Sequence, residues 1–149
     1  MNFFKSDIEK WTQLKAEIVV EEELPVMIAR FTGIYRRGSE GNPDGNFMFA
    51  KLNEHASIWD PACIILDLRE LEYTFGNTLL NSLRFFAVTN KLEADQLLVI
   101  VVVSSKCREA IEGLLGAFVK NHPIDLLEDM DEALKRAEKM IKEYLDIEE

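Results

Sequence analysis

The sequence predicts an α/β protein with a mixed sheet of four to five strands, helices packed on the sheet and an extra N-terminal helix. Two observations carry this prediction. The apolar runs "ACIILDL" and "QLLVIVVVSS" have the length and composition of strands that are covered on both faces. Each run is followed by a stretch in which apolar residues recur at the spacing of one helix face. Because such alternation requires right-handed crossovers, we expect a largely parallel central sheet.

Length and charge narrow the class of protein. We interpret residues 1–149 as a single domain, in which residues 1–17 form a helical extension. The 27 acidic residues outnumber the 17 basic ones and give a net charge of −10. Because a chain of this charge is repelled by phosphate groups and anionic lipids, we expect it to bind neither nucleic acid nor membranes.

The first third of the chain predicts a helix, two strands and a loop. Ser6 and Glu9 have the spacing of a capping box, which predicts a helix over about residues 6–16. The β-rich runs "AEIVVEEEL" and "PVMIARFTGIY" predict a hairpin or neighbouring strands. Residues 36–46, "RRGSEGNPDGN", have the composition of an exposed loop, with a binding loop as the alternative. Their glycines fit neither the dinucleotide-binding nor the P-loop spacing.

Alternating helices and strands are predicted for the rest of the chain. The predicted helices span about residues 46–59, 77–91, 106–120 and 130–147, and the strands between them span residues 62–68, 96–105 and 123–129.

This order of elements, together with three local features, resembles the STAS family of small α/β domains related to bacterial anti-sigma-factor antagonists. The features are "IILDLRELEYTFGNTLLNSL", "QLLVIVVVSS" and "IDLLEDMDEALKRA", and the resemblance covers roughly residues 18–145. It implies a STAS-like sheet and a bacterial, cytoplasmic, non-enzymatic regulatory module that binds a protein partner. A homo-oligomer is left open.

The resemblance also implies where a partner binds. The family carries a phosphorylated serine or threonine just before the glycine of a turn. With Gly76 matched to that glycine, Phe75 occupies the phosphoacceptor position and cannot accept phosphate, so Thr74 is the candidate phosphoacceptor. A threonine in a turn more often only bonds the backbone. The expected partner-binding residues are Asp67, Tyr73, Thr74, Phe75, Gly76, Asn77, Asn81 and Arg84, with Ser82 on the same polar surface.

This interpretation depends on an exposed aromatic ring at Tyr73 or Phe75, which would anchor the partner. Asp67 is the one acid that an apolar strand delivers to its C-terminal end. A strand-end aspartate can instead cap the next turn, which is the commoner case.

We predict no catalytic residues, no metal site and no cofactor. Cys63 and Cys107 lack a CxxC spacing and are expected to be thiols in or near the core, and His55 and His122 lack any ligand-like spacing. The acids of residues 128–132 have the pattern of a helix start and do not match a calcium loop.

Two other functions remain open. The first is an acidic inhibitor or immunity-type protein that neutralises a basic enzyme, which predicts that acids converge on one surface. The second is a carrier of a small molecule or lipid, or an unrecognised enzyme, which predicts a sizeable apolar pocket at the C-terminal edge of the strands. The N-terminal residues lack the apolar stretch of a signal peptide, so we expect a cytoplasmic protein.

Overall fold

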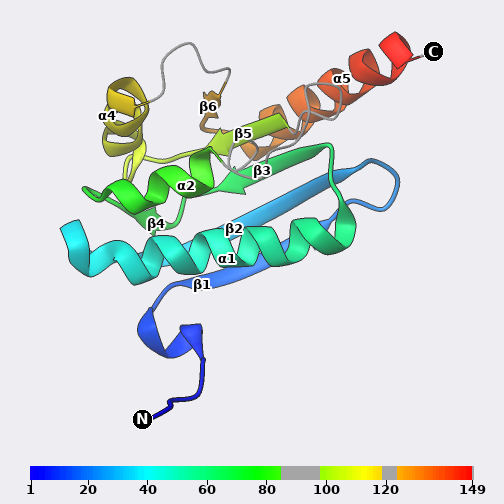
Figure 1. Cartoon of the computed structure of the whole chain (residues 1–149). Coiled ribbons are helices and arrows are strands. Elements are labelled where there is room, and N and C mark those ends of the chain that lie inside the picture. The colour runs from blue at the N-terminus through cyan, green and yellow to red at the C-terminus, as the bar shows by residue number, and fades with distance from the viewer. Residues whose placement is uncertain (85–97, 119–123, 149) are drawn as a thin grey trace.

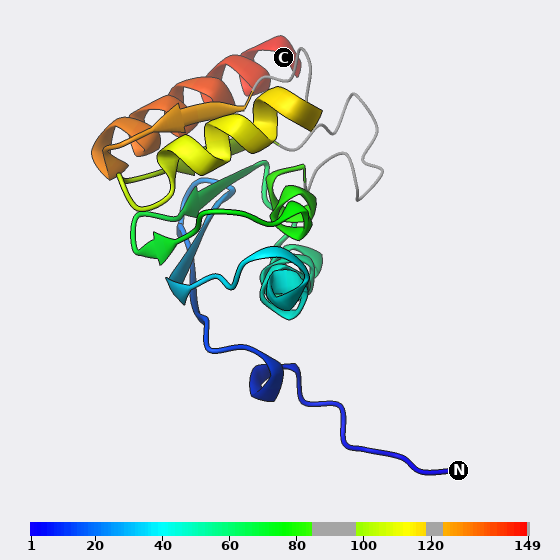
Figure 2. The same ribbon diagram turned by 90° about the vertical axis from the view of Figure 1, so that its left-hand side faces the viewer.

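One mixed β-sheet runs through the protein and carries helices on both faces (Figures 1 and 2). The computed structural model describes residues 1–84, 98–118 and 124–148. Within these residues the sheet has six strands in the order β1-β2-β3-β5-β6, and β4 pairs with β2. The strands are β1 (Lys15–Val20), β2 (Val26–Ile34), β3 (Cys63–Asp67), β4 (Leu71–Glu72), β5 (Leu98–Val102) and β6 (Asp125–Leu127). The predicted mixed α/β architecture is therefore confirmed.

The helices follow the predicted order. The α-helices are α1 (Asn42–Trp59), α2 (Leu80–Leu83), α4 (Arg108–Phe118) and α5 (Met130–Glu148), and the 3₁₀ helices are η1 (Ile8–Trp11), η2 (Gly38–Gly41) and η3 (Asn77–Leu79). The predicted helix over residues 77–91 is described only at its beginning, because residues 85–91 lie outside the described residues. His122 also lies outside the described residues.

Strand pairing confirms the expected hairpin and the parallel centre of the sheet. β1 and β2 are antiparallel, with Lys15 opposite Thr32 and Val20 opposite Met27. β2, β3, β5 and β6 pair in parallel. β4 was not predicted, because a strand of two residues has no periodicity to detect. It pairs in parallel with the end of β2, where Ile34 lies opposite Glu72.

Two hydrophobic clusters lie on opposite faces of the sheet. The larger contains side chains of α1, α2 and α4, whereas the smaller contains side chains of α5. All five residues of β3 are buried, and they alternate between the two clusters until Asp67 ends the strand. Burial on both faces explains why this strand has a continuous apolar run.

The predicted N-terminal helix over residues 6–16 is wrong in length and type. Only η1 forms there, no side-chain cap bond is made at its start, and β1 already begins at Lys15. Leu14 is buried in the larger cluster, and the Thr12 hydroxyl donates a hydrogen bond to the Asp44 carboxylate. These tertiary contacts hold residues 12–14 outside a helix and override the local capping pattern.

The predicted loop over residues 36–46 is also shorter than expected. η2 occupies part of it, and α1 begins at Asn42, four residues before the predicted start at Asn46. Pro43 lies in the first turn of α1, where the missing N–H of proline has no intrahelical partner to lose. Gly45 and Asp44 are buried in that turn, so the segment is part of the folded core.

Cys63 and Cys107 are both buried and unpaired, which confirms that they are core thiols. Across the described part of the chain, no helix combines the length and the apolar character needed to cross a bilayer.

Candidate functional site

Tyr73 ties the turn after β4 to the core. The Tyr73 ring is buried and packs edge-on against Tyr35, with 5.0 Å between the ring centroids. Its hydroxyl donates a hydrogen bond to the Gly76 carbonyl oxygen at 2.6 Å. Burial raises the pKa of Tyr73 to about 12, so the hydroxyl keeps its proton and remains a donor at ordinary pH. Tyr73 therefore shapes the turn from inside and is not the exposed anchor that one form of the hypothesis required.

Gly76 closes the turn in a conformation that favours glycine. Its φ is +146°, and a Cβ at this position would lie 3.0 Å from Cε1 of Tyr35. A side chain here would be strained both by the backbone and by the neighbouring ring. The matched glycine of the sequence analysis is thus a structural requirement of the turn.

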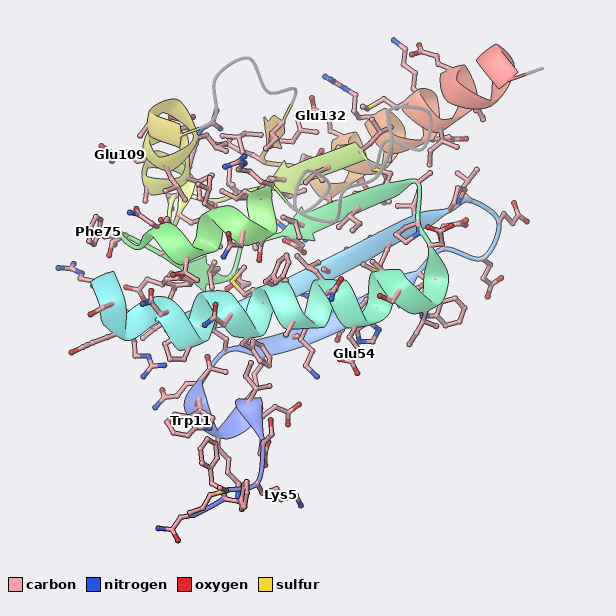
Figure 3. The ribbon with its side chains drawn as sticks, viewed as in Figure 1. Lys5, Trp11, Glu54, Phe75, Glu109 and Glu132 are labelled. Carbon is pink, nitrogen blue, oxygen red and sulfur yellow. The ribbon has the colours of Figure 1, made fainter. Side chains whose placement is uncertain are left out.

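Thr74 and Phe75 form the exposed tip of the turn. Phe75 is 60% exposed and projects outward beside η2 (Figure 3). A Cβ on Gly38 would lie 3.9 Å from Cε1 of Phe75, so the ring rests beside the start of η2. The Thr74 hydroxyl accepts a hydrogen bond from Nε of Arg37 at 3.1 Å. An aromatic ring, a hydroxyl and a guanidinium thus share one surface.

The short helices after the turn extend this surface. Asn77 and Asn81 are exposed, and Arg84 is half-buried. Ser82, in contrast, is fully buried, so the expectation that it belongs to the polar surface is wrong. The helical turn directs Ser82 toward the core because Leu79 and Leu83, its neighbours on that side, are buried there too.

Asp67 lies below the surface and binds two arginines. It is 3% exposed, and its carboxylate accepts hydrogen bonds from Nε and Nη2 of Arg69, both at 2.9 Å. Arg30, opposite Asp67 on β2, is 3.8 Å away. Burial opposes ionisation of Asp67, but the hydrogen bonds from Arg69 and the charges of both arginines outweigh it and lower its pKa. Asp67 therefore positions Arg69, which remains partly exposed.

An open depression of about 350 Å³ adjoins Thr74 at the start of α4. Its lining residues are Tyr73, Thr74, Ser105, Lys106, Cys107, Glu109 and Ala110. Lys106 on this rim forms an ion pair with Glu70 at 3.0 Å. With charged and hydroxyl groups in its lining, the depression differs from the sizeable apolar pocket that a lipid or small-molecule carrier would need.

Acidic side chains are spread over the described surface instead of converging. Glu54 lies on α1, Glu109 on α4 and Glu132 at the start of α5, three separate places in Figure 3. A further acidic group, residues 21–23, lies in the β1–β2 turn. This distribution differs from the single acidic face that the inhibitor hypothesis expects. The acids of residues 128–132 do stand at a helix start: Asp129 accepts a hydrogen bond from the backbone N–H of Asp131.

No group of three histidine, cysteine, aspartate or glutamate residues that could hold a metal ion occurs in the residues that the structure describes. The partners that sequence reasoning missed are Arg37, Gly38 and Lys106. Arg37 and Gly38 meet the turn because β2 pairs with β4, and the Lys106 carbonyl accepts a hydrogen bond from the Tyr73 N–H. Each contact joins residues more than 30 positions apart. No spacing rule could have found them.

Comparison with solved structures reveals the fold of this chain. An anti-sigma factor antagonist from Mycobacterium paratuberculosis is similar, with a TM-score of 0.54 and 20% sequence identity over 85% of this chain and 95% of that one. The anti-sigma factor antagonist SpoIIAA in its unphosphorylated form aligns with a TM-score of 0.49 and 12% identity over 83% of this chain and 98% of that one. Neither protein-family models nor the curated proteins contain a match. The first of these likenesses confirms the STAS-like fold.

Proposed function

We propose that this protein is a non-enzymatic regulatory module of the cytoplasm that binds a protein partner through the strand–turn–helix surface around residues 73–84. The observation that carries the proposal is Phe75, an aromatic side chain that is 60% exposed on a turn closed by the hydrogen bond from Tyr73 to Gly76. Phenylalanine and other aromatic side chains are enriched in the buried core of protein interfaces relative to the rest of the surface. The fold supports this, because the similar chain from Mycobacterium paratuberculosis is an anti-sigma factor antagonist.

Different residues of the predicted set have different roles in this proposal. Thr74, Phe75, Asn77 and Asn81 are exposed and would contact the partner, while Arg84 lies half-buried beside them. Tyr73 and Gly76 hold the shape of the turn, and Asp67 positions Arg69. These buried residues would affect binding through geometry and not by contact. The polar residues would contribute specificity, whereas the ring would contribute most of the buried apolar area.

Thr74 is the proposed site of regulation. Its hydroxyl lies 3.1 Å from Arg37 Nε, and Lys106 lines the adjoining depression. A phosphate on Thr74 would add about −1.5 to −2 charges beside Arg37 and could pair with its guanidinium. It would thus change the charge of the surface beside Phe75 without unfolding the turn.

Affinity capture tests the partner surface. The wild type, Phe75→Ala, Thr74→Glu and the control Trp59→Ala are each used to capture proteins from extract of the native cell, at low and high salt. Trp59 is a suitable control because it is 56% exposed and is the last residue of α1, whereas Phe75 lies beside Gly38, which precedes the start of this helix. A protein retained by the wild type and Trp59→Ala but lost with Phe75→Ala supports the proposal.

Two outcomes would count against the proposed surface. A basic partner that survives both turn variants and dissociates only at high salt would favour the acidic-inhibitor alternative. A partner lost equally with Trp59→Ala would place the interface elsewhere. Titration calorimetry with the purified partner then measures the affinity. Loss of the anchoring ring is expected to weaken the binding free energy by about 2 kcal/mol or more.

A further inference from the structure

β1 is an edge strand with unused backbone groups. It ends the strand order of the sheet, so within the described residues its outer side has no neighbouring strand. The Glu21 N–H donates to the Val26 carbonyl at the hairpin end. Along an antiparallel pair, residues whose backbone groups bond the neighbouring strand alternate with residues whose backbone groups point away from it. This alternation directs the N–H and C=O groups of Ala16, Ile18 and Val20 outward. Such an edge is a template for one more strand.

A groove runs along this edge. It has a volume of about 300 Å³ and lies between β1 and α1. Its lining residues are Glu9, Leu14, Lys15, Ala16, Ile18, Phe47, Lys51 and His55. Phe47, Lys51 and His55 are four residues apart and therefore lie on one face of α1. A strand added to β1 would direct every second side chain toward this groove.

The N-terminal arm, residues 1–7, has the properties of such a strand. It lies outside regular secondary structure and extends away from the sheet (Figures 1 and 2). Phe3 is 88% and Phe4 is 78% exposed, among the most exposed large apolar side chains of the described chain. Seven residues are enough to pair along the six residues of β1.

The two phenylalanines of the arm have apolar side chains of the edge to contact on both faces of an added strand. Because neighbouring side chains of a strand point to opposite faces, one of Phe3 and Phe4 would enter the groove and the other would cover the opposite face. On that face Val19 of β1 is 48% exposed. One ring would therefore pack beside Ala16, Ile18 and Phe47 of the groove, whose lining also carries charged side chains. The other ring would pack beside Val19.

We propose that the N-terminal arm of one copy binds along β1 of a second copy as an added strand, so that two copies exchange arms reciprocally. The arm of the same copy leaves η1, whose Glu9 lines the groove, and heads away from β1 (Figure 2). The arm that pairs with this edge would therefore come from a second copy. In a reciprocal exchange each copy gives one arm and receives one, so the assembly stops at a dimer. This interface is separate from the turn at residues 73–77 and does not rest on the proposed function.

Sedimentation equilibrium of the purified full chain tests the exchange. The expected result is a dimer whose dissociation constant rises by at least about 100-fold in Phe3→Ser/Phe4→Ser, since two apolar rings lose their burial. The control Ile58→Ser/Trp59→Ser removes two other exposed apolar side chains and should leave the dimer intact. A chain that is monomeric at every concentration would overturn the proposal, as would a dimer unaffected by the arm variant.

Ala16→Pro tests the edge itself. Proline removes a backbone N–H that points outward, so the β1–β2 pairing survives while the added strand loses a donor. We expect a folded monomer, with the fold checked by circular dichroism. A dimer as strong as the wild type would contradict an interface at this edge.

A cross-linking experiment decides whose arm occupies the edge. A photoreactive phenylalanine analogue replaces Phe3 in an isotope-labelled chain, which is then mixed with unlabelled chain. Cross-links between labelled and unlabelled chains at β1 support exchange. Cross-links only to β1 of the same chain, or to no part of β1, would overturn it.

Discussion

Arg37 and Thr74 are joined by a hydrogen bond of 3.1 Å between the guanidinium Nε and the threonine hydroxyl. The bond links the glycine-containing segment before α1 to the turn after β4, two segments that β2 and β4 bring side by side in parallel. It explains how a basic group comes to stand beside the exposed Phe75 in a chain whose net charge is −10.

Substitution of the exposed side chains of the turn should leave the stability of the protein almost unchanged. Thr74→Val and Phe75→Ala are expected to alter the free energy of unfolding by no more than about 0.5 kcal/mol, because both side chains face solvent. Tyr73→Phe should cost about 0.5–1.5 kcal/mol, because the Gly76 carbonyl loses its buried hydroxyl donor. Urea denaturation of the three variants compares these values. Equal stability of Tyr73→Phe and wild type would show that this hydroxyl does not hold the turn.

Asp44→Asn should destabilise the protein by about 2–4 kcal/mol near neutral pH. The Asp44 carboxylate is fully buried and accepts hydrogen bonds from the Arg36 guanidinium, the Arg36 backbone N–H and the Thr12 hydroxyl. Asparagine keeps the shape but loses the charge. Glu22→Gln, at an exposed position, serves as the control and should change little.

The cost of Asp44→Asn should depend on pH. Burial opposes ionisation of Asp44, but the hydrogen bonds from Arg36 and Thr12 outweigh it and lower the pKa below its ordinary value of 3.8. A carboxyl whose pKa is lower in the folded state stabilises the fold above its unfolded pKa and loses this effect as pH falls through the folded pKa. The difference between wild type and Asp44→Asn, measured by urea denaturation, should therefore shrink below about pH 4. A difference that grows in acid would contradict an ionised Asp44.

Gly45→Ala and Gly113→Ala should have opposite effects, although both glycines lie in helices. A Cβ on Gly45 would lie 2.5 Å from the Tyr35 hydroxyl oxygen and 2.7 Å from Cγ2 of Thr78, so we expect a loss of about 1–3 kcal/mol. A Cβ on Gly113 would meet nothing within 4 Å, so alanine should stabilise α4 by about 0.5–1 kcal/mol. Thermal unfolding measures both. A stabilising Gly45→Ala would show that α1 does not approach Tyr35 this closely.

Neither cysteine should react with thiol reagents in the folded protein. Burial raises the pKa of Cys63 to about 12 and also raises that of Cys107, so both remain protonated and enclosed at pH 8. Labelling by an aromatic disulfide should therefore proceed only at the rate of unfolding, and both thiols should react at once in denaturant. Rapid labelling of the native protein would place a thiol at the surface.

The fold class could be predicted from the sequence, because periodicity and apolar runs report burial directly. β3 and β5 were recognised from continuous apolar residues, and α5 from its apolar spacing, since each is buried over most of one or both faces. The resemblance of the residues around Gly76 to a known family also led to the fold that the structural comparison confirms. Each of these signals lies within a short stretch of consecutive residues, so it can be recognised in one sequence.

Contacts between distant parts of the chain determine where the structure departs from the local sequence signals. The capping pattern of Ser6 and Glu9 yields to the burial of Leu14 and the bond between Thr12 and Asp44. The same holds for the candidate surface: parallel pairing of β2 and β4 delivers Arg37 to Thr74, buries Tyr73 against Tyr35 and leaves Phe75 outside. Such contacts join residues more than 30 positions apart, and no spacing along the sequence encodes them.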